Sequence, residues 1–322
     1  MNPRARSVSA VVGLLVALSG CRAEPDGPAA GSPPPPEGPV VLSLLGETLH
    51  PREDSTGAVA VALDSLAASP DDVELILAAG HAQAGVWDYV EAIRLYNRAV
   101  AEAPDDWRGY RFRGHRYMSI RRLPTALTDL EIARDLSPHS FDVAYHLGLA
   151  YYLAGVSEGA ADEYGRCMAL ARDAEALALE ASGDFGEGFR SCMSIATSDN
   201  TRVAITNWRY LALRRSGRHQ EAETLLDGID ADMDIGTNAA YHAVLLFYKG
   251  MLSEEDLLAA DNPAGYRLET VGYPVAAWHL AEGDTARALA LLEQVAAHPH
   301  WPGFGRMAAE SDLAAMRRAD VR

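Results

Sequence analysis

Apolar residues between positions 73 and 172 recur at three- and four-residue spacing, in runs that short turns separate. This spacing places them on one face of a helix and predicts a series of amphipathic helices. A single pair of such helices cannot bury its apolar face alone, so neighbouring pairs must stack to form a shared core. The pattern therefore predicts an all-α protein.

The helical pattern repeats with a period of 34 residues. Pro104 and Pro138 keep this step, and proline ends a helix because it lacks an amide hydrogen and clashes with the preceding turn. Four further columns have the same period: Gly80, Gly114 and Gly148; Ala92, Ala126 and Ala160; Tyr96, Leu130 and Tyr164; Ala99, Ala133 and Cys167.

These columns resemble the tetratricopeptide repeat (TPR), in which small residues lie where the two helices of a unit cross. The resemblance implies a TPR-like α-solenoid of about five or six helix pairs, counted from the runs below. It predicts three regular TPRs over 73–172, beginning at Val73, Trp107 and Phe141.

The register slips after the third repeat. Residues 173–203 fit no repeat and are predicted to form an irregular segment. Residues 204–300 are predicted to hold divergent TPR-like helix pairs, and residues 301–322 a capping helix and tail. Within 204–300 the expected pairs cover 208–229, 240–260 and 278–296.

The first 21 residues have a basic start, with Arg4 and Arg6, followed by a short apolar core. They end in Leu-Ser-Gly-Cys, which resembles a bacterial lipobox and predicts a lipoprotein signal peptide with Cys21 lipidated. The alternative is a plain secretory signal with a coincidental cysteine. Residues 22–39 hold seven prolines and three glycines, and are expected to form a disordered tether. Residues 40–72 are expected to dock on the solenoid as an N-terminal extension.

A lipobox, a tether and a TPR body are similar in layout to the new-lipoprotein-I type of bacterial outer-membrane adaptor. Those proteins are helical dimers that bring cell-wall hydrolases to a periplasmic protease. The layout implies a scaffold or adaptor in the bacterial cell envelope, lipid-anchored to the outer membrane and facing the periplasm. It also implies a protein or peptide partner, no cofactor, and a homodimer as one alternative. The shared motifs are those of any TPR, so specific partners do not carry over.

Composition narrows the partners. The chain is 48% hydrophobic and carries a formal net charge of −17. Such an acidic protein lacks the broad basic face that nucleic acid requires. No second apolar run reaches the 18 or more residues of a membrane-spanning helix, so the predicted membrane attachment is the lipid alone.

Against this acidity, residues 108–122 contain six arginines and one histidine. By the TPR resemblance, Arg113 and Arg116 lie on the helix flank. Arg111, His115 and His146 occupy the positions with which one TPR subclass grips a peptide's C-terminal carboxylate, although histidines replace its asparagines. The expected groove residues are Arg108, Arg111, His115, Tyr145, His146 and Tyr152. The alternative is a solvated basic face that nearby acidic residues, such as Asp106 and Asp129, neutralise.

No nucleophile elbow, phosphate-binding glycine loop or zinc-hydrolase motif is present. The chain is therefore expected not to be an enzyme. His81, His115 and His146 fall on successive helices, too far apart to converge on one metal ion. An enzyme or small-ligand receptor that uses the same Arg/His/Tyr groove remains the alternative. A deep, closed pocket would favour it, whereas an open trough would favour the adaptor.

Cys167 and Cys192 remain after the predicted cleavage and lipidation. Export would place them where disulfides form, so they are hypothesised to join the irregular segment to the third repeat. The alternative is two buried thiols.

Overall fold

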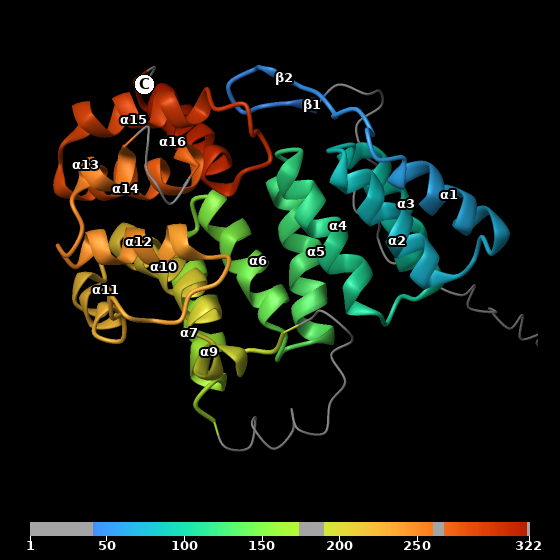
Figure 1. Cartoon of the computed structure of the whole chain (residues 1–322), viewed down its shortest axis with the longest axis horizontal. Coiled ribbons are helices and arrows are strands. Elements are labelled where there is room, and N and C mark those ends of the chain that lie inside the picture. Colours follow the sequence, from blue (N-terminus) through green and yellow to red (C-terminus); the bar gives the residue numbers. More distant parts are fainter. Residues whose placement is uncertain (1–40, 174–189, 260–266, 321–322) are drawn as a thin grey trace, which may run out of the picture. The chain divides into compact units, whose positions relative to one another are not determined.

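The computed structural model describes residues 41–173, 190–259 and 267–320. Helices dominate these residues, and the one sheet within them has two short strands (Figure 1). The predicted all-α solenoid of TPR-like helix pairs is confirmed. The predicted signal peptide, Cys21 and the tether lie outside the described residues. No helix among the described residues is long and apolar enough to cross a membrane.

Three consecutive helix pairs begin at the predicted residues. Asp72, Asp106 and Ser140 each precede a pair and accept a hydrogen bond from a backbone amide in its first turn. These caps satisfy amides that a helix start leaves without a partner. The pairs are α2 (Val73–Gly85) with α3 (Tyr89–Glu102), α4 (Trp107–Ser119) with α5 (Leu123–Leu136), and α6 (Phe141–Leu153) with α7 (Ser157–Leu170).

The N-terminal extension forms a hairpin of β1 (Val41–Leu42) and β2 (Thr48–Leu49), followed by α1 (Ala58–Ala68). Val41 and Leu49 are buried in the main core, and α1 packs on α2. The short strands carry too few residues for a periodic pattern, so the sequence does not predict them.

Where it is described, the segment between α7 and α10 has little regular secondary structure. Cys192 donates its backbone amide to the carbonyl of His139 at 2.8 Å, beside α9 (Ser194–Thr197). The boundary at 203 is wrong, because α10 (Asp199–Arg215) already begins at Asp199. Ser198 caps this helix by accepting from the Thr201 amide, and the sequence around it breaks the 34-residue register.

The remaining helices also form pairs. Helix α10 packs on α11 (His219–Leu226), α12 (Ala239–Tyr248) on α13 (Glu254–Leu258), and α14 (Leu268–Glu282) on α15 (Thr285–Ala296). The final helix, α16 (Phe304–Asp320), covers α14 and α15 and also contacts α6 of the third repeat.

The C-terminal segment contacts the second repeat as well. Arg121, in the turn between α4 and α5, forms an ion pair with Glu310 of α16 at 2.7 Å. Both side chains are buried, at 4% and 0% exposure. Trp301 packs edge-on against Trp87 and Tyr89, with ring centroids 5.7 and 5.1 Å apart. These contacts place Trp301 and α16 beside the turns that join the two helices of the first and second repeats.

Candidate functional site

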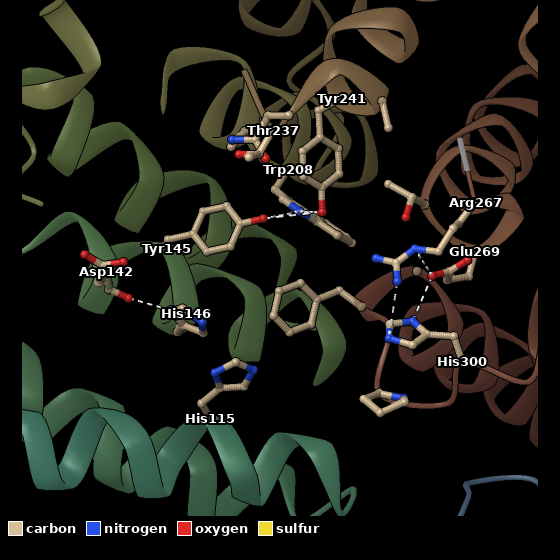
Figure 2. Close-up of a pocket in the computed structure, with 18 of the residues that line it drawn as sticks. His115, Asp142, Tyr145, His146, Trp208, Thr237, Tyr241, Arg267, Glu269 and His300 are labelled. Atoms are coloured by element: carbon tan, nitrogen blue, oxygen red, sulfur yellow. Dashed lines mark hydrogen bonds and ion pairs between the residues drawn. The ribbon is translucent and has the colours of Figure 1, made fainter. Parts of the chain in front are cut away.

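A cavity of about 810 Å³ lies where α4 and α6 face the C-terminal segment. Helix α10 contributes Trp208, and the start of α12 contributes Tyr241 (Figure 2). The start of α14 and residues 300–305 complete the lining. We call this cavity the arginine pocket, because Arg111, Arg116, Arg190 and Arg267 all line it.

The repeat side of the arginine pocket holds two histidines in contact. The rings of His115 on α4 and His146 on α6 have centroids 4.4 Å apart. His146 donates from Nδ1 to the carbonyl oxygen of Asp142 at 2.6 Å, which leaves its Nε2 as an acceptor 3.5 Å from Arg111 Nη2. Arg116 Nη2 donates to His115 Nδ1 at 2.5 Å.

Both histidines are held uncharged. Burial, reinforced by Arg116, lowers the pKa of His115 well below its ordinary value. Burial, reinforced by Arg111, does the same to the pKa of His146. At neutral pH these two residues therefore add hydrogen-bonding groups but no charge.

The arginines beside them lack close anionic partners. Burial lowers the pKa of Arg111 to about 10, although Asp142 opposes the shift. The nearest Asp142 oxygen is 3.7 Å away, and that carboxylate instead accepts from Arg190 at 2.9 and 3.1 Å. Among the described residues, Arg111 Nε has no hydrogen-bond partner and Arg116 forms no ion pair. Burial also lowers the pKa of Arg116.

The side opposite the arginines is aromatic. Trp208 Nε1 donates to the hydroxyl of Tyr145 at 3.0 Å, and that hydroxyl donates to Tyr241 at 3.4 Å. The ring of Phe304, the first residue of α16, contacts both groups, with its centroid 5.4 Å from that of His115, 6.0 Å from that of His146 and 6.4 Å from that of Tyr145.

A third group lies at the start of α14. Glu269 is 1% exposed and accepts from His300 Nδ1 at 2.8 Å and from Arg267 Nε at 3.1 Å. Burial works to raise the pKa of Glu269, but the hydrogen bond from His300 holds it below its ordinary value. The charged partner of this carboxylate is Arg267, and its Oε2 has no hydrogen-bond partner among the described residues.

Four of the six predicted groove residues line the pocket: Arg111, His115, Tyr145 and His146. Arg108 does not, because it forms ion pairs with Glu74 and Asp106 at 2.5 and 2.6 Å. Tyr152 does not either, since it is 1% exposed and its hydroxyl accepts from Tyr273 at 2.8 Å. Arg108 and Tyr152 therefore lie outside this pocket, and their assignment to a peptide-binding groove stays a prediction.

The two flank arginines differ from one another. Arg113 is buried against Asp129, with two hydrogen bonds of 2.8 Å. Arg116, predicted on the flank, instead lines the pocket. Neutralisation by acidic neighbours therefore describes Arg108 and Arg113, but not Arg111 and Arg116.

No protein-family model and no curated protein matches the chain. Solved structures of TPR proteins are distantly similar. MamA is 21% identical with a TM-score of 0.40, over 52% of this chain and 82% of MamA. YrrB, described as a TPR protein with an unusual peptide-binding site, is 13% identical with a TM-score of 0.42, over 81% and 100%. A TPR protein from Parabacteroides merdae is 13% identical with a TM-score of 0.45, over 79% and 90%.

Sequence reasoning missed the far side of the pocket. Trp208, Tyr241, Glu269, His300 and Phe304 come from segments that follow the regular repeats. No motif marks them, and the 34-residue period gives no register for them. Among the described residues, no group of three or more His, Cys, Asp or Glu residues could hold a metal ion.

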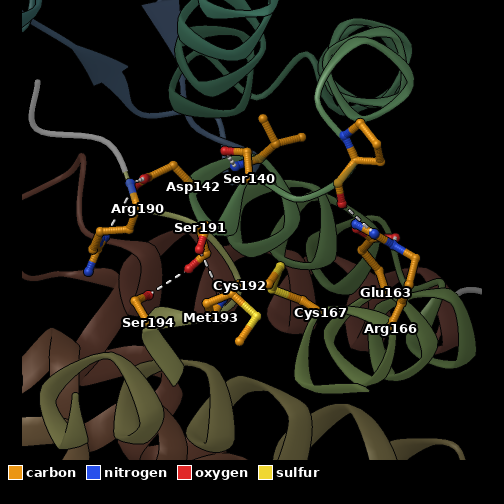
Figure 3. Close-up of a disulfide and its surroundings, with 12 residues drawn as sticks. Ser140, Asp142, Glu163, Arg166, Cys167, Arg190, Ser191, Cys192, Met193 and Ser194 are labelled. Carbon is orange, nitrogen blue, oxygen red and sulfur yellow. Dashed lines mark hydrogen bonds and ion pairs between the residues drawn. A yellow bond between two sulfur atoms is a disulfide. The ribbon is translucent and has the colours of Figure 1, made fainter. Parts of the chain in front are cut away.

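The two cysteines lie beside the site. The structure joins Cys167 of α7 to Cys192 in a disulfide, with Cα atoms 5.2 Å apart (Figure 3). The same segment carries Arg190, which binds Asp142 in the pocket. The disulfide thus fixes to the third repeat a segment that contributes a pocket arginine.

Proposed function

We propose that this protein binds the anionic end of a partner protein or peptide in the arginine pocket. The observation that carries this proposal is the pair Arg111 and Arg116, whose partly buried guanidinium groups have no carboxylate within hydrogen-bond distance among the described residues; the nearest to Arg111 is Asp142 at 3.7 Å. A buried guanidinium without an anion is costly. A carboxylate or phosphate would relieve that cost, because it is negatively charged and can accept two parallel hydrogen bonds from one guanidinium.

The size of the pocket supports a short ligand. Its volume of about 810 Å³ lies within the roughly 300–1,000 Å³ of typical ligand pockets. His300 and residues 302–305 line its C-terminal side. A chain terminus or a single acidic side chain of a partner therefore suits the pocket better than a long segment.

The proposed setting is the periplasmic face of a bacterial outer membrane, with the chain attached through lipid on Cys21. The lipobox-like ending and the Pro-rich segment support this proposal. The test is to express Cys21→Ala beside the wild type and fractionate the cells. We expect wild type in the outer-membrane fraction and the variant in the soluble fraction, whereas identical distributions would contradict lipid anchoring.

The binding proposal is tested by cross-linking and affinity capture with the tagged full-length chain. The variant is Arg111→Gln/Arg116→Gln, and the control is Arg94→Gln, whose exposed guanidinium pairs with Glu91. Unchanged helical circular dichroism would establish that both fold. We expect a partner that wild type and control capture and the double variant loses. Equal capture by all three proteins would place the interface elsewhere.

A receptor or enzyme for a small anionic molecule is the second candidate. The volume of the pocket favours it, since a cavity of about 810 Å³ is large enough for a small ligand. Native mass spectrometry of the protein from its own cells is the test. A small anion bound to wild type and absent from the double variant would favour this candidate over a protein partner.

A further inference from the structure

We propose that the ligand's anionic group and an aromatic ring belong to one residue-sized unit, so that the pocket selects a carboxylate that carries an aromatic side chain. This inference rests on the proposed function and specifies its ligand. Two sources share this chemistry: a free aromatic acid, and a peptide whose last residue is aromatic.

The first argument is the state of the aromatic side of the pocket. Hydrogen bonds of 3.0 and 3.4 Å join the polar atoms of Tyr145, Trp208 and Tyr241 to one another. Their polar groups are therefore satisfied before a ligand enters. Trp208 is 1% and Tyr145 9% exposed, so the ring surface left for a ligand belongs mainly to the half-buried Tyr241 and Phe304, which can pair favourably with another aromatic ring.

The second argument is the short distance between the aromatic and cationic sides. Tyr145 and His146 are neighbours on α6, with ring centroids 5.5 Å apart. Arg111 Nη2 lies 3.4 and 3.5 Å from the two ring nitrogens of the same imidazole. A ligand that touches both sides must carry its ring and its anion within one residue-sized unit, as phenylalanine with a free carboxylate does.

The third argument is the placement of small residues. Ala204, Ala240, Gly303 and Gly305 line the pocket among the large side chains. At Gly303 and Gly305 a Cβ atom would overlap Glu269, so these two glycines let the segment before α16 pack closely on α14. The small residues next to the aromatic side are therefore Ala204, one turn before Trp208 on α10, and Ala240, which precedes Tyr241 on α12.

The test is isothermal titration of the purified full-length protein with four small probes. N-acetyl-phenylalanine carries both features, its amide lacks the charge, N-acetyl-alanine lacks the ring, and N-acetyl-cyclohexylalanine keeps the size without aromaticity. We expect N-acetyl-phenylalanine to bind about tenfold or more tightly than each of the others, as one lost charge-assisted hydrogen bond or ring contact implies. Matched hexapeptides ending in phenylalanine or alanine then separate the two sources.

The outcomes separate this inference from the proposed function. Equal binding of the phenylalanine, cyclohexylalanine and alanine acids, all tighter than the amide, would overturn the aromatic inference and leave anion binding intact. No binding of any carboxylate would overturn both. Tight binding of the phenylalanine peptide alone would support the inference with a peptide as the source, and equal binding of the free acid would support it with a small molecule.

A variant places the ring within the pocket. Ala240→Leu, in the first turn of α12, would fill space beside Tyr241. We expect it to lose the preference for phenylalanine over alanine while N-acetyl-alanine still binds. Ala67→Leu, on the exposed side of α1, is the matched control. An unchanged preference in Ala240→Leu would overturn the placement, and the four probes on wild type decide the ligand class even if this variant does not fold.

Discussion

Single residues set how closely the helices of a repeat approach. Gly80 and Gly148 lie where their helices cross, and a Cβ atom at either would overlap the ring of Tyr96 or Tyr164 respectively. At Gly114 the added atom would lie 2.8 Å from Leu130 Cγ. The glycine column of the 34-residue period therefore marks three positions where the two helices of a repeat are in close contact.

Gly148→Ala is expected to lower the free energy of unfolding by about 1–3 kcal/mol, the typical cost of an extra methyl group in a packed core. Urea unfolding measures it. Gly85→Ala is the control, because it is also helical and a Cβ atom there has nothing within 4 Å. The control should be neutral or slightly stabilising, and an equal loss in both variants would contradict the crowding argument.

The pocket histidines predict a pH dependence. Burial holds the pKa values of His115 and His146 well below the ordinary value of a histidine. Below about pH 6.5 these two side chains therefore take up protons in the unfolded chain but stay neutral in the folded protein. Stability is therefore full above that pH and falls as the pH falls. We expect a loss of up to about 1.4 kcal/mol per pH unit for each histidine.

Urea unfolding at pH 7, 6 and 5 measures this dependence. His115→Asn should reduce its slope, because one depressed histidine is removed, while His146 and His81, whose pKa burial also lowers, keep the rest. His219→Asn, at an exposed position on α11, should leave the slope unchanged. A flat profile in the wild type over this range would show that the histidines are not held neutral.

Among the elements, the sequence predicted best where the repeat is regular. Helices α2, α4 and α6 begin at the predicted residues, because caps and apolar spacing there agree. The start of α10 was not predicted, because Ser198 caps that helix within a stretch that lacks the residues of the 34-residue repeat. The hairpin was missed because two-residue strands carry no periodic pattern.

The link between α7 and the following segment yields an element-scale prediction. Trypsin should release residues 167–172 and 191–202 as one disulfide-linked pair from the unreduced protein. Replacing both cysteines by alanine should lower the free energy of unfolding by about 3–4 kcal/mol, from the loop that the bond closes. Recovery of the two peptides separately without reductant would mean that the thiols are free.

At the scale of the whole molecule, the arginine pocket combines segments that are far apart in the sequence. Arg111 and His146 could be predicted because they lie in regular repeats. Trp208, Glu269 and Phe304 could not, because their positions depend on how α16 packs against α6. That packing is decided by side chains such as Arg121 and Glu310, which are 189 residues apart.

Glu310 ties three segments together. It accepts from Arg121, from Arg306 at 3.1 Å and from the backbone amide of Leu44 at 3.2 Å. Glu310→Gln leaves the buried guanidinium of Arg121 without its anion and Arg306 with Glu47 alone, so the free energy of unfolding should fall by about 3–5 kcal/mol. Urea unfolding measures this loss, and Glu293→Gln on the exposed side of α15 should leave it near zero. Equal effects would mean that the buried pair adds nothing.

The contact between α16 and the repeats also limits how this protein can evolve. An open array of repeats can gain or lose a unit by duplication or deletion, because each unit contacts only its neighbours. Here the C-terminal helix meets both the turn after α4 and the face of α6. One unit more or fewer between them would separate Glu310 from Arg121 and remove Phe304 from the pocket. The number of repeats is therefore inherited together with the binding site, and variation among descendants should be confined to side chains and surface loops.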